Sequence, residues 1–187
     1  MKSLKVCIDP GHGMSNRKTG VYDPGACSGP FSEADIVLQW GLTLKFVFEE
    51  AGIPVYMTRS NDKDSNPVGT RDDRAEAQNC THFISLHCNA GESRATGTET
   101  YYRDAPDKNF ASVVQKATLE TLGLKDRGLK TEHDSQHSRL AIFDFDGAAC
   151  LLELGFISNK NDRDKMLLRD NRVKFAEKLR DYFKGLK

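Results

Sequence analysis

The chain has 187 residues, with 27 Lys and Arg against 27 Asp and Glu, and 38% of its residues are hydrophobic. This length and composition fit one globular domain, because a chain of this size buries about 70% of the surface that it exposes when unfolded. The balanced charge argues against a general nucleic-acid binder, the apolar stretches are shorter than the roughly 20 residues of a membrane span, and the supply of aromatic and branched residues argues against disorder.

Strands and helices are predicted to alternate along the first half of the chain. The clearest helix has Ile36, Trp40 and Leu44 at the 3.6-residue period, with Ser32 as its N-cap and Gly52 as its end. In chain order, we predict a strand at 4–9, a Gly- and Pro-rich loop at 10–32, a helix at 33–51, a strand at 53–58, a polar loop at 61–67, a short polar helix at 69–79 and a strand at 82–86.

The second half continues the alternation. Residues 149–154 form a nearly continuous apolar run bounded by glycines, which is typical of a strand that is buried on both faces. In chain order, we predict a strand at 98–102, a helix at 109–122 closed by Gly123, a polar segment at 126–138 that is mostly loop with a short strand, the strand at 149–154, and helices at 160–168 and 171–186. This order predicts a single α/β domain over residues 1–187 with a mostly parallel sheet.

Five cysteines, an odd number with no C-x-x-C pair, favour free thiols in a reducing compartment over a disulfide framework or a thiolate zinc site. The apolar run near the N-terminus is interrupted by Asp9, so the sequence contains no core of a signal peptide. We therefore expect synthesis in the cytoplasm, with a leader removed beforehand as the alternative.

Four polar side chains are expected to meet at one rim of the sheet. In open α/β sheets, ligands bind beyond the carboxyl ends of the strands. His12 follows the first predicted strand, His87 follows the third, Glu33 opens the first helix and Glu153 lies in the last strand. Their separations match no local metal-binding pattern, so this grouping depends on topology alone.

Three of these residues have an ordinary structural alternative. His12 is equally compatible with a loop histidine and His87 with a histidine at a strand end. For Glu33 by itself the structural alternative is favoured, an acid in the first turn that interacts with the helix dipole. Glu153 differs, because a carboxylate within an apolar strand is rare unless it is paired or functional. The residues alone therefore favour a functional role most strongly at Glu153.

Four motifs occur in this order along the chain: Ile-Asp-Pro-Gly-His12-Gly, Ser32-Glu33-Ala-Asp, Ile84-Ser-Leu-His87-Cys-Asn89-Ala and Leu152-Glu153-Leu-Gly-Phe-Ile-Ser-Asn159. Together they resemble the motifs of the zinc-dependent N-acetylmuramoyl-L-alanine amidases, the amidase-3 family. The resemblance extends over nearly the whole chain. Jointly the motifs are highly specific, although each one is short.

The resemblance implies a twisted sheet of about six strands flanked by helices. It also implies one Zn²⁺ held by His12, Glu33 and His87, with Glu153 as the catalytic glutamate. Three protein ligands leave a fourth position open, which is typical of a catalytic zinc. The implied reaction is hydrolysis of the amide bond between N-acetylmuramic acid and the L-alanine of the peptidoglycan stem peptide. The implied partner is peptidoglycan, without nucleic acid or membrane insertion, and we expect a monomer.

The sequence supports weaker predictions for several further residues. Asp9 would tie down the turn at 11–13 or orient His12, and Asn89 would contact substrate. Strand alternation turns His82 and Cys88 away from the face of His87, so both are predicted to be structural. His133 and His137, four residues apart in a polar segment, would either line a substrate groove or belong to a solvated loop; the loop is favoured.

Two departures from the family pattern are visible. Residues 144–150 lack the Pro-containing stretch that relatives often place before the last strand, and residues 103–147 leave no room for the autoinhibitory helix of some cell-division relatives. We therefore expect a constitutively open site that acts on the cell wall. A small phage or prophage endolysin is the favoured interpretation. The alternatives are a bacterial autolysin or sporulation amidase domain, or a non-catalytic wall-binding module.

Overall fold

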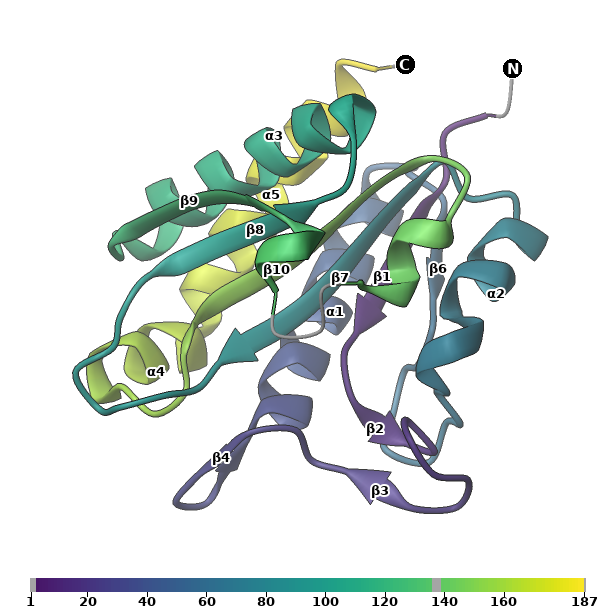
Figure 1. Cartoon of the computed structure of the whole chain (residues 1–187). Helices are drawn as coiled ribbons and strands as arrows, with labels where there is room; N and C mark the ends of the chain where they lie inside the picture. Colours follow the sequence, from purple (N-terminus) through teal and green to yellow (C-terminus); the bar gives the residue numbers. More distant parts are fainter. Residues whose placement is uncertain (1–2, 136–138, 187) are drawn as a thin grey trace.

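The computed structural model describes residues 3–135 and 139–186, and its centre is a twisted six-stranded sheet (Figure 1). Four neighbouring strands are parallel, whereas β8 runs antiparallel to β10 and β9 runs parallel to β8. Across the sheet the order is β6 (Val55–Met57), β1 (Val6–Pro10), β7 (His82–Asn89), β10 (Ala148–Phe156), β8 (Thr98–Tyr102) and β9 (Asp126–Thr131). The predicted α/β domain with a mostly parallel six-stranded sheet is confirmed.

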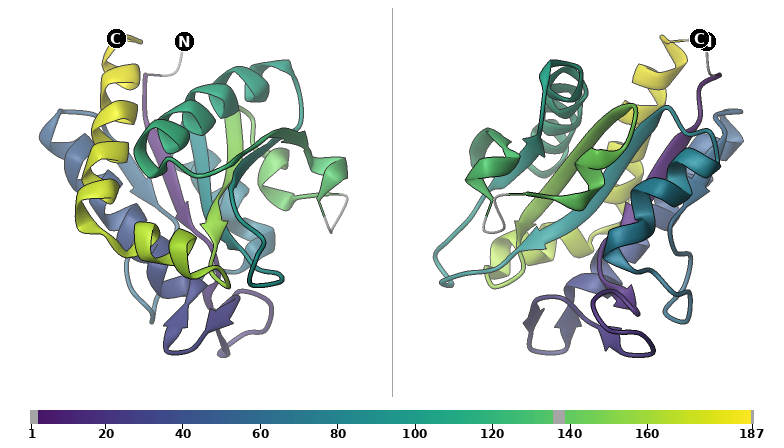
Figure 2. Two further views of the ribbon diagram at one scale, coloured as in Figure 1. Left: turned by 90° about the vertical axis from the view of Figure 1, so that its left-hand side faces the viewer. Right: turned by 45° about the vertical axis from the view of Figure 1, so that its right-hand side comes forward.

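Helices cover both faces of this sheet unequally. The larger core lies under α1 (Glu33–Glu50), α3 (Ala105–Leu122) and α5 (Arg169–Lys184), and α5 packs against both of the others (Figure 2). The smaller core lies under α2 (Arg71–Ala77) and a 3₁₀ turn, η3 (Ala141–Asp144). The remaining helical elements are α4 (Lys160–Leu167) after β10, η1 (Val68–Thr70) and η2 (Glu132–Asp134). No helix in the described part of the chain is long and apolar enough to cross a lipid bilayer.

The alternation along β7 sends chemically different side chains to the two faces. Ile84 and Leu86 enter the larger core, whereas Phe83 enters the smaller one. Ser85 and His87 share the face of Phe83, because successive strand residues point to opposite sides. The smaller core therefore ends, toward the carboxyl ends of the strands, in polar residues.

The helix boundaries agree with the sequence periodicity, and one difference has a local cause. The helix predicted to begin at residue 109 begins at Ala105, since the side chain of Asp104 accepts a hydrogen bond from the Asp107 amide and Pro106 occupies the first turn. Both features are preferred at helix N-termini.

Among the strand predictions, two differ from the structure and one is confirmed. Strand β7 continues to Asn89, so His87 lies inside the strand rather than after it. Residues 126–131 form β9 at the edge of the sheet, which is the short strand predicted within the polar segment 126–138. The loop at 10–32 contains two hairpins, β2 (Gly13–Met14) with β3 (Tyr22–Asp23) and β4 (Cys27–Ser28) with β5 (Phe31–Ser32).

The five cysteines, all in the described part of the chain, differ sharply in accessibility. Cys27 is exposed on β4, whereas the other four are buried. Burial raises the pKa of the Cys7, Cys88 and Cys150 thiols, which lowers their reactivity further.

We expect one thiol of the native protein to react quickly with a disulfide reagent such as Ellman's reagent, and five thiols after denaturation. The fast thiol should disappear in the Cys27→Ser variant. Fewer than five thiols in the denatured, unreduced protein would contradict the expectation of free cysteines.

Candidate metal and active site

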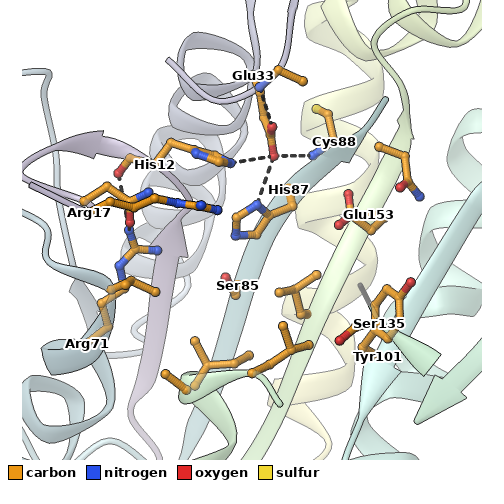
Figure 3. A pocket seen from close by; sticks show the side chains of 18 of the residues that line it. His12, Arg17, Glu33, Arg71, Ser85, His87, Cys88, Tyr101, Ser135 and Glu153 are labelled. Atoms are coloured by element: carbon orange, nitrogen blue, oxygen red, sulfur yellow. Dashed lines mark hydrogen bonds and ion pairs between the residues drawn. The ribbon is translucent and has the colours of Figure 1, made fainter. Parts of the chain in front are cut away.

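The carboxylate of Glu33 is the centre of the site (Figure 3). Its Oε1 lies 3.0 Å from His12 Nε2 and 2.9 Å from His87 Nδ1, and it accepts a hydrogen bond of 2.9 Å from the backbone N–H of Cys88. Its Oε2 accepts a 3.0 Å bond from the backbone N–H of Ala26. Glu33, which is buried, thus joins the loop after β1, the β4 hairpin and β7 at the first residue of α1.

The backbone around this carboxylate needs glycine at two positions. A Cβ on Gly11 would lie 2.4 Å from His87 Cε1, inside the imidazole ring's van der Waals envelope. Gly25 has a φ of +66°, and a Cβ there would lie 2.7 Å from Glu33 Oε2. His12 itself has a φ of +62°. A non-glycine residue in this region is uncommon and costs about 1–3 kcal/mol, so the surrounding contacts must hold it there.

His12, Glu33 and His87 form a group that is able to hold a metal ion. One ligand atom from each residue lies within 4.8 Å of the others, and this is the sole such group of three among the residues the structure describes. The structure therefore brings the three predicted ligands together, although they come from a loop, a helix start and a strand.

Burial and hydrogen bonding oppose each other at these groups. Burial disfavours ionisation of Glu33, but the hydrogen bonds from His12 and His87 outweigh it and hold the pKa of the carboxyl below its ordinary value. Burial likewise disfavours the cation of His12, whereas Glu33 and Asp23 favour it and raise its pKa. The pocket therefore holds a carboxylate between two imidazoles.

Asp23 orients His12, a role that the sequence did not reveal. Its Oδ2 lies 3.1 Å from His12 Nδ1 and also accepts a hydrogen bond from Asn16 Nδ2. Because Nδ1 is engaged by Asp23, Nε2 is directed toward Glu33. The pairing of Gly13 with Asp23 in the β2–β3 hairpin creates this contact, and that hairpin was hidden within the predicted loop.

Asp9, in contrast, does not contact the His12 side chain. It is fully buried and accepts hydrogen bonds from Thr58 Oγ1 (2.6 Å), Ser85 Oγ (2.7 Å) and Arg71 Nη1 (3.1 Å). Arg71 Nη2 in turn donates to the His12 carbonyl (3.4 Å), so Asp9 reaches the turn at 11–13 through Arg71. The predicted anchoring of the turn is thus indirect, and the predicted orientation of His12 by Asp9 is wrong.

Glu153 lies beside this group but outside it. On the sheet it is in register with His87 of β7 on one side and with Glu99 of β8 on the other. Its side chain is half-buried, and Oε2 is closed off from solvent without a hydrogen bond to any residue of the described chain. Burial, followed by the charges of Glu33 and Glu99, raises the pKa of the Glu153 carboxyl well above its ordinary value.

A pocket of about 640 Å³ connects these residues. The two histidines, Glu33 and Glu153 line it together with the apolar residues Leu140, Ala141 and Ile142. Arg17, Asn89 and Tyr101 also line it. Figure 3 shows the Arg17 side chain reaching into this space alongside His12. A concave site with apolar residues and a few converging polar groups suits a small organic substrate.

The weaker predictions, for the other histidines and for Cys88, have different outcomes. The His82 ring packs edge-on against Phe110 and Phe183, and burial lowers its pKa to about 4, so its predicted structural place is confirmed. Cys88 points into the larger core, where its Sγ lies 3.7 Å from Met166 Sδ, as predicted. His133 is exposed on η2, and His137 lies outside the described residues.

Comparisons with known proteins agree on the whole length of the domain. The sequence pattern of the N-acetylmuramoyl-L-alanine amidase family matches residues 6–183. N-acetylmuramoyl-L-alanine amidase CwlM of Bacillus licheniformis is 30% identical over 87% of this chain, and a sporulation-specific N-acetylmuramoyl-L-alanine amidase of Bacillus subtilis is 31% identical over 87%. The matched part is 60% of the length of each of these two relatives.

The fold is also shared with a solved structure. The catalytic domain of CwlV, an N-acetylmuramoyl-L-alanine amidase from Bacillus (Paenibacillus) polymyxa var. colistinus, superposes with a TM-score of 0.83 at 29% identity and covers 98% of both chains.

The contact between Asp23 and His12 generates a prediction. Loss of a carboxylate that orients a metal-binding histidine typically lowers metal affinity about 10- to 100-fold. We expect a loss of this size for zinc in Asp23→Ala, measured by competition with a chromogenic chelator. Asp62→Ala is the matched control, because Asp62 contacts Tyr22 and Arg59 but not His12. Equal zinc affinity in both variants would contradict the role of Asp23.

Proposed function

The chain belongs to the N-acetylmuramoyl-L-alanine amidase family, and from that premise we propose that it hydrolyses the amide bond between N-acetylmuramic acid and L-alanine in peptidoglycan, using one Zn²⁺. The observation that carries the proposal is the convergence of His12 and His87 on the buried carboxylate of Glu33, with Glu153 beside them. This arrangement suits hydrolysis better than binding alone, because a non-catalytic wall-binding module would not require a glutamate with an unsatisfied buried oxygen next to a metal site.

The three donors fit zinc. Imidazole nitrogen and carboxylate oxygen are its usual ligands besides thiolate, and a His₂Glu set leaves a position open, as in catalytic sites. His12, Glu33 and His87 would hold the ion. When bound, it would polarise the scissile carbonyl and increase the acidity of the attacking water.

Glu153 would move the proton. A carboxyl whose pKa is raised by burial can accept a proton from the attacking water and deliver it to the departing amine of L-alanine. The orphan Oε2 of Glu153 is consistent with this role, because it is a buried acceptor that no residue of the described chain satisfies.

We further propose that the natural setting is a phage or prophage endolysin, with a bacterial autolysin or sporulation amidase as the alternative. The sporulation-specific relative of Bacillus subtilis supports the alternative. The two settings are separated by the time at which a host that carries the gene lyses. Lysis at the end of phage replication would indicate an endolysin.

The reaction is tested by digesting purified muropeptides and analysing the products by mass spectrometry. We expect separated sugar and peptide fragments, with a new free amino group on L-alanine. Intact muropeptides, bound but not cleaved by the zinc-loaded protein, would identify a binding module instead.

The metal itself generates a prediction with a pH dependence. Protein prepared without chelators should contain one zinc per chain, and His12→Ala should lose it. Because Glu33 and Asp23 raise the pKa of His12 in the metal-free site, protons compete for this ligand over a higher pH range than at an isolated histidine. Zinc affinity should therefore fall as the pH decreases from 8 to 5. Affinity that is constant from pH 8 to pH 5 would exclude His12 as a ligand.

Glu153→Gln should separate the metal site from proton transfer. The amide keeps the shape of the side chain but cannot carry the proton, a function that is typically worth about 10²- to 10⁴-fold in rate. We expect kcat to fall by that factor while the zinc content and the melting temperature stay close to those of the parent. Turnover near the parent's value would remove Glu153 from the mechanism.

A further inference from the structure

Glu99, on β8, is a buried acid beside the site that the proposed mechanism does not use. It is 3% exposed, and its two oxygens accept four side-chain hydrogen bonds. The donors are Asn89 Nδ2 (2.9 Å) and the Tyr101 hydroxyl (3.0 Å) to Oε1, and Arg127 Nε (2.6 Å) and Lys130 Nζ (2.5 Å) to Oε2.

Two cations keep this carboxylate ionised. Burial opposes ionisation of Glu99, but the hydrogen bonds from Lys130, Asn89 and Arg127 outweigh it and lower its pKa to about 2. Arg127 and Lys130 both belong to β9, and each also lies over an aromatic ring, Phe156 and Tyr101 respectively. Glu99 is therefore an acceptor only at any pH near neutrality.

An acceptor-only partner determines which way the Asn89 amide is turned. Asn89 can meet Glu99 only with its NH₂ group, so Oδ1 is the end left for other partners. Asn89 lines the pocket, and it is on the same face as His87, two residues away along β7. Its Oδ1 accepts no hydrogen bond from any residue of the described chain and is not closed off from solvent.

The bond between Asn89 and Glu99 also crosses the strand that carries Glu153. Asn89 is on β7 and Glu99 on β8, and β10 lies between these two strands. Glu99 is in register with Glu153, which in turn is in register with His87. The free oxygen of Asn89 is consequently placed beside the residues that would act on the scissile bond.

We propose that Asn89, held in this orientation by Glu99, is a substrate-binding residue whose Oδ1 accepts a hydrogen bond from an amide N–H next to the scissile bond. The inference rests on the proposed amidase function. The substrate offers two such groups, the acetamido N–H of the muramic acid and the N–H of the peptide bond that follows L-alanine. Both are neutral donors that match an exposed carbonyl oxygen.

The first test compares three substrates with the zinc-loaded protein: a muramyl dipeptide, its analogue N-methylated at the bond after L-alanine, and its analogue N-methylated at the acetamido group of the muramic acid. We expect kcat/KM of the parent to fall about tenfold on one analogue, which identifies the N–H that Asn89 contacts. Asn89→Ala should have a lower kcat/KM than the parent on the unmodified substrate. Its kcat/KM should be the same on the unmodified substrate and on that analogue, because the variant lacks the acceptor oxygen.

The second test reverses the polarity of the pair. Asn89→Asp alone places two carboxylates against each other and should lower kcat/KM more than tenfold. In the double variant Asn89→Asp with Glu99→Gln, the new glutamine donates to the new aspartate, whose other oxygen still faces the pocket. We expect the double variant to recover about tenfold over Asn89→Asp, a rescue that general destabilisation would not produce.

Asp162→Asn is the matched control, because Asp162 is a fully buried carboxylate that accepts bonds from Thr96, Gly97 and Phe156 away from the pocket. This variant should lower the melting temperature and leave the ratio between the three substrates unchanged. The proposal is overturned if the parent treats all three substrates alike, if Asn89→Ala discriminates as the parent does, or if the double variant recovers nothing. A parent that cleaves no muropeptide would overturn the amidase function together with it.

Discussion

A single buried carboxylate organises this protein's site. Removing an ionised carboxylate from water costs several kcal/mol unless hydrogen bonds and opposite charge compensate for it. Glu33 therefore has to be surrounded by donors, and they come from four positions, His12, Ala26, His87 and Cys88. These four donors belong to three segments that are far apart in the sequence, because His87 and Cys88 are neighbours on β7. The loop after β1, the β4–β5 hairpin and the end of β7 are consequently fixed relative to the start of α1.

The sheet supplies the second constraint, because it sorts side chains by face. The larger core packs against one face of the sheet, under α1, α3 and α5. The opposite face carries the smaller core and then, toward the carboxyl ends of the strands, Ser85, His87, Glu153 and Glu99. Two carboxylates side by side on this face have opposite surroundings. Glu99 is compensated by four donors, whereas Glu153 is left with an unsatisfied oxygen. The same strand pairing thus gives one acid that stays charged and one that is prepared to carry a proton.

Sequence reasoning predicted the fold class, most elements and the convergence of His12, Glu33, His87 and Glu153, because apolar periodicity and the rule for strand ends act through local pattern and chain order. Sequence reasoning did not identify Asp23 and Glu99 as residues of the site. Their importance comes from cross-strand pairing, Asp23 with Gly13 and Glu99 with Glu153, which no local pattern encodes. The same limit explains why the short strand predicted within 126–138 could not be given bounds, because Arg127 and Lys130 of β9 pair with Glu99 instead of alternating with apolar residues. The Asp-Pro-Gly sequence at 23–25 signals the turn after β3, not the β2–β3 hairpin that orients His12.

The central claim is that Glu33 and two imidazoles bind one zinc ion, with Glu153 outside the coordination sphere. X-ray absorption at the zinc K-edge of the loaded protein tests it most directly. The account predicts two imidazole nitrogens at about 2.0–2.1 Å and oxygen from one protein carboxylate at about 2.0–2.2 Å, with the remaining scattering from solvent. Sulfur scattering at about 2.3 Å, which would place a cysteine on the metal, or a single imidazole in the first shell would contradict it.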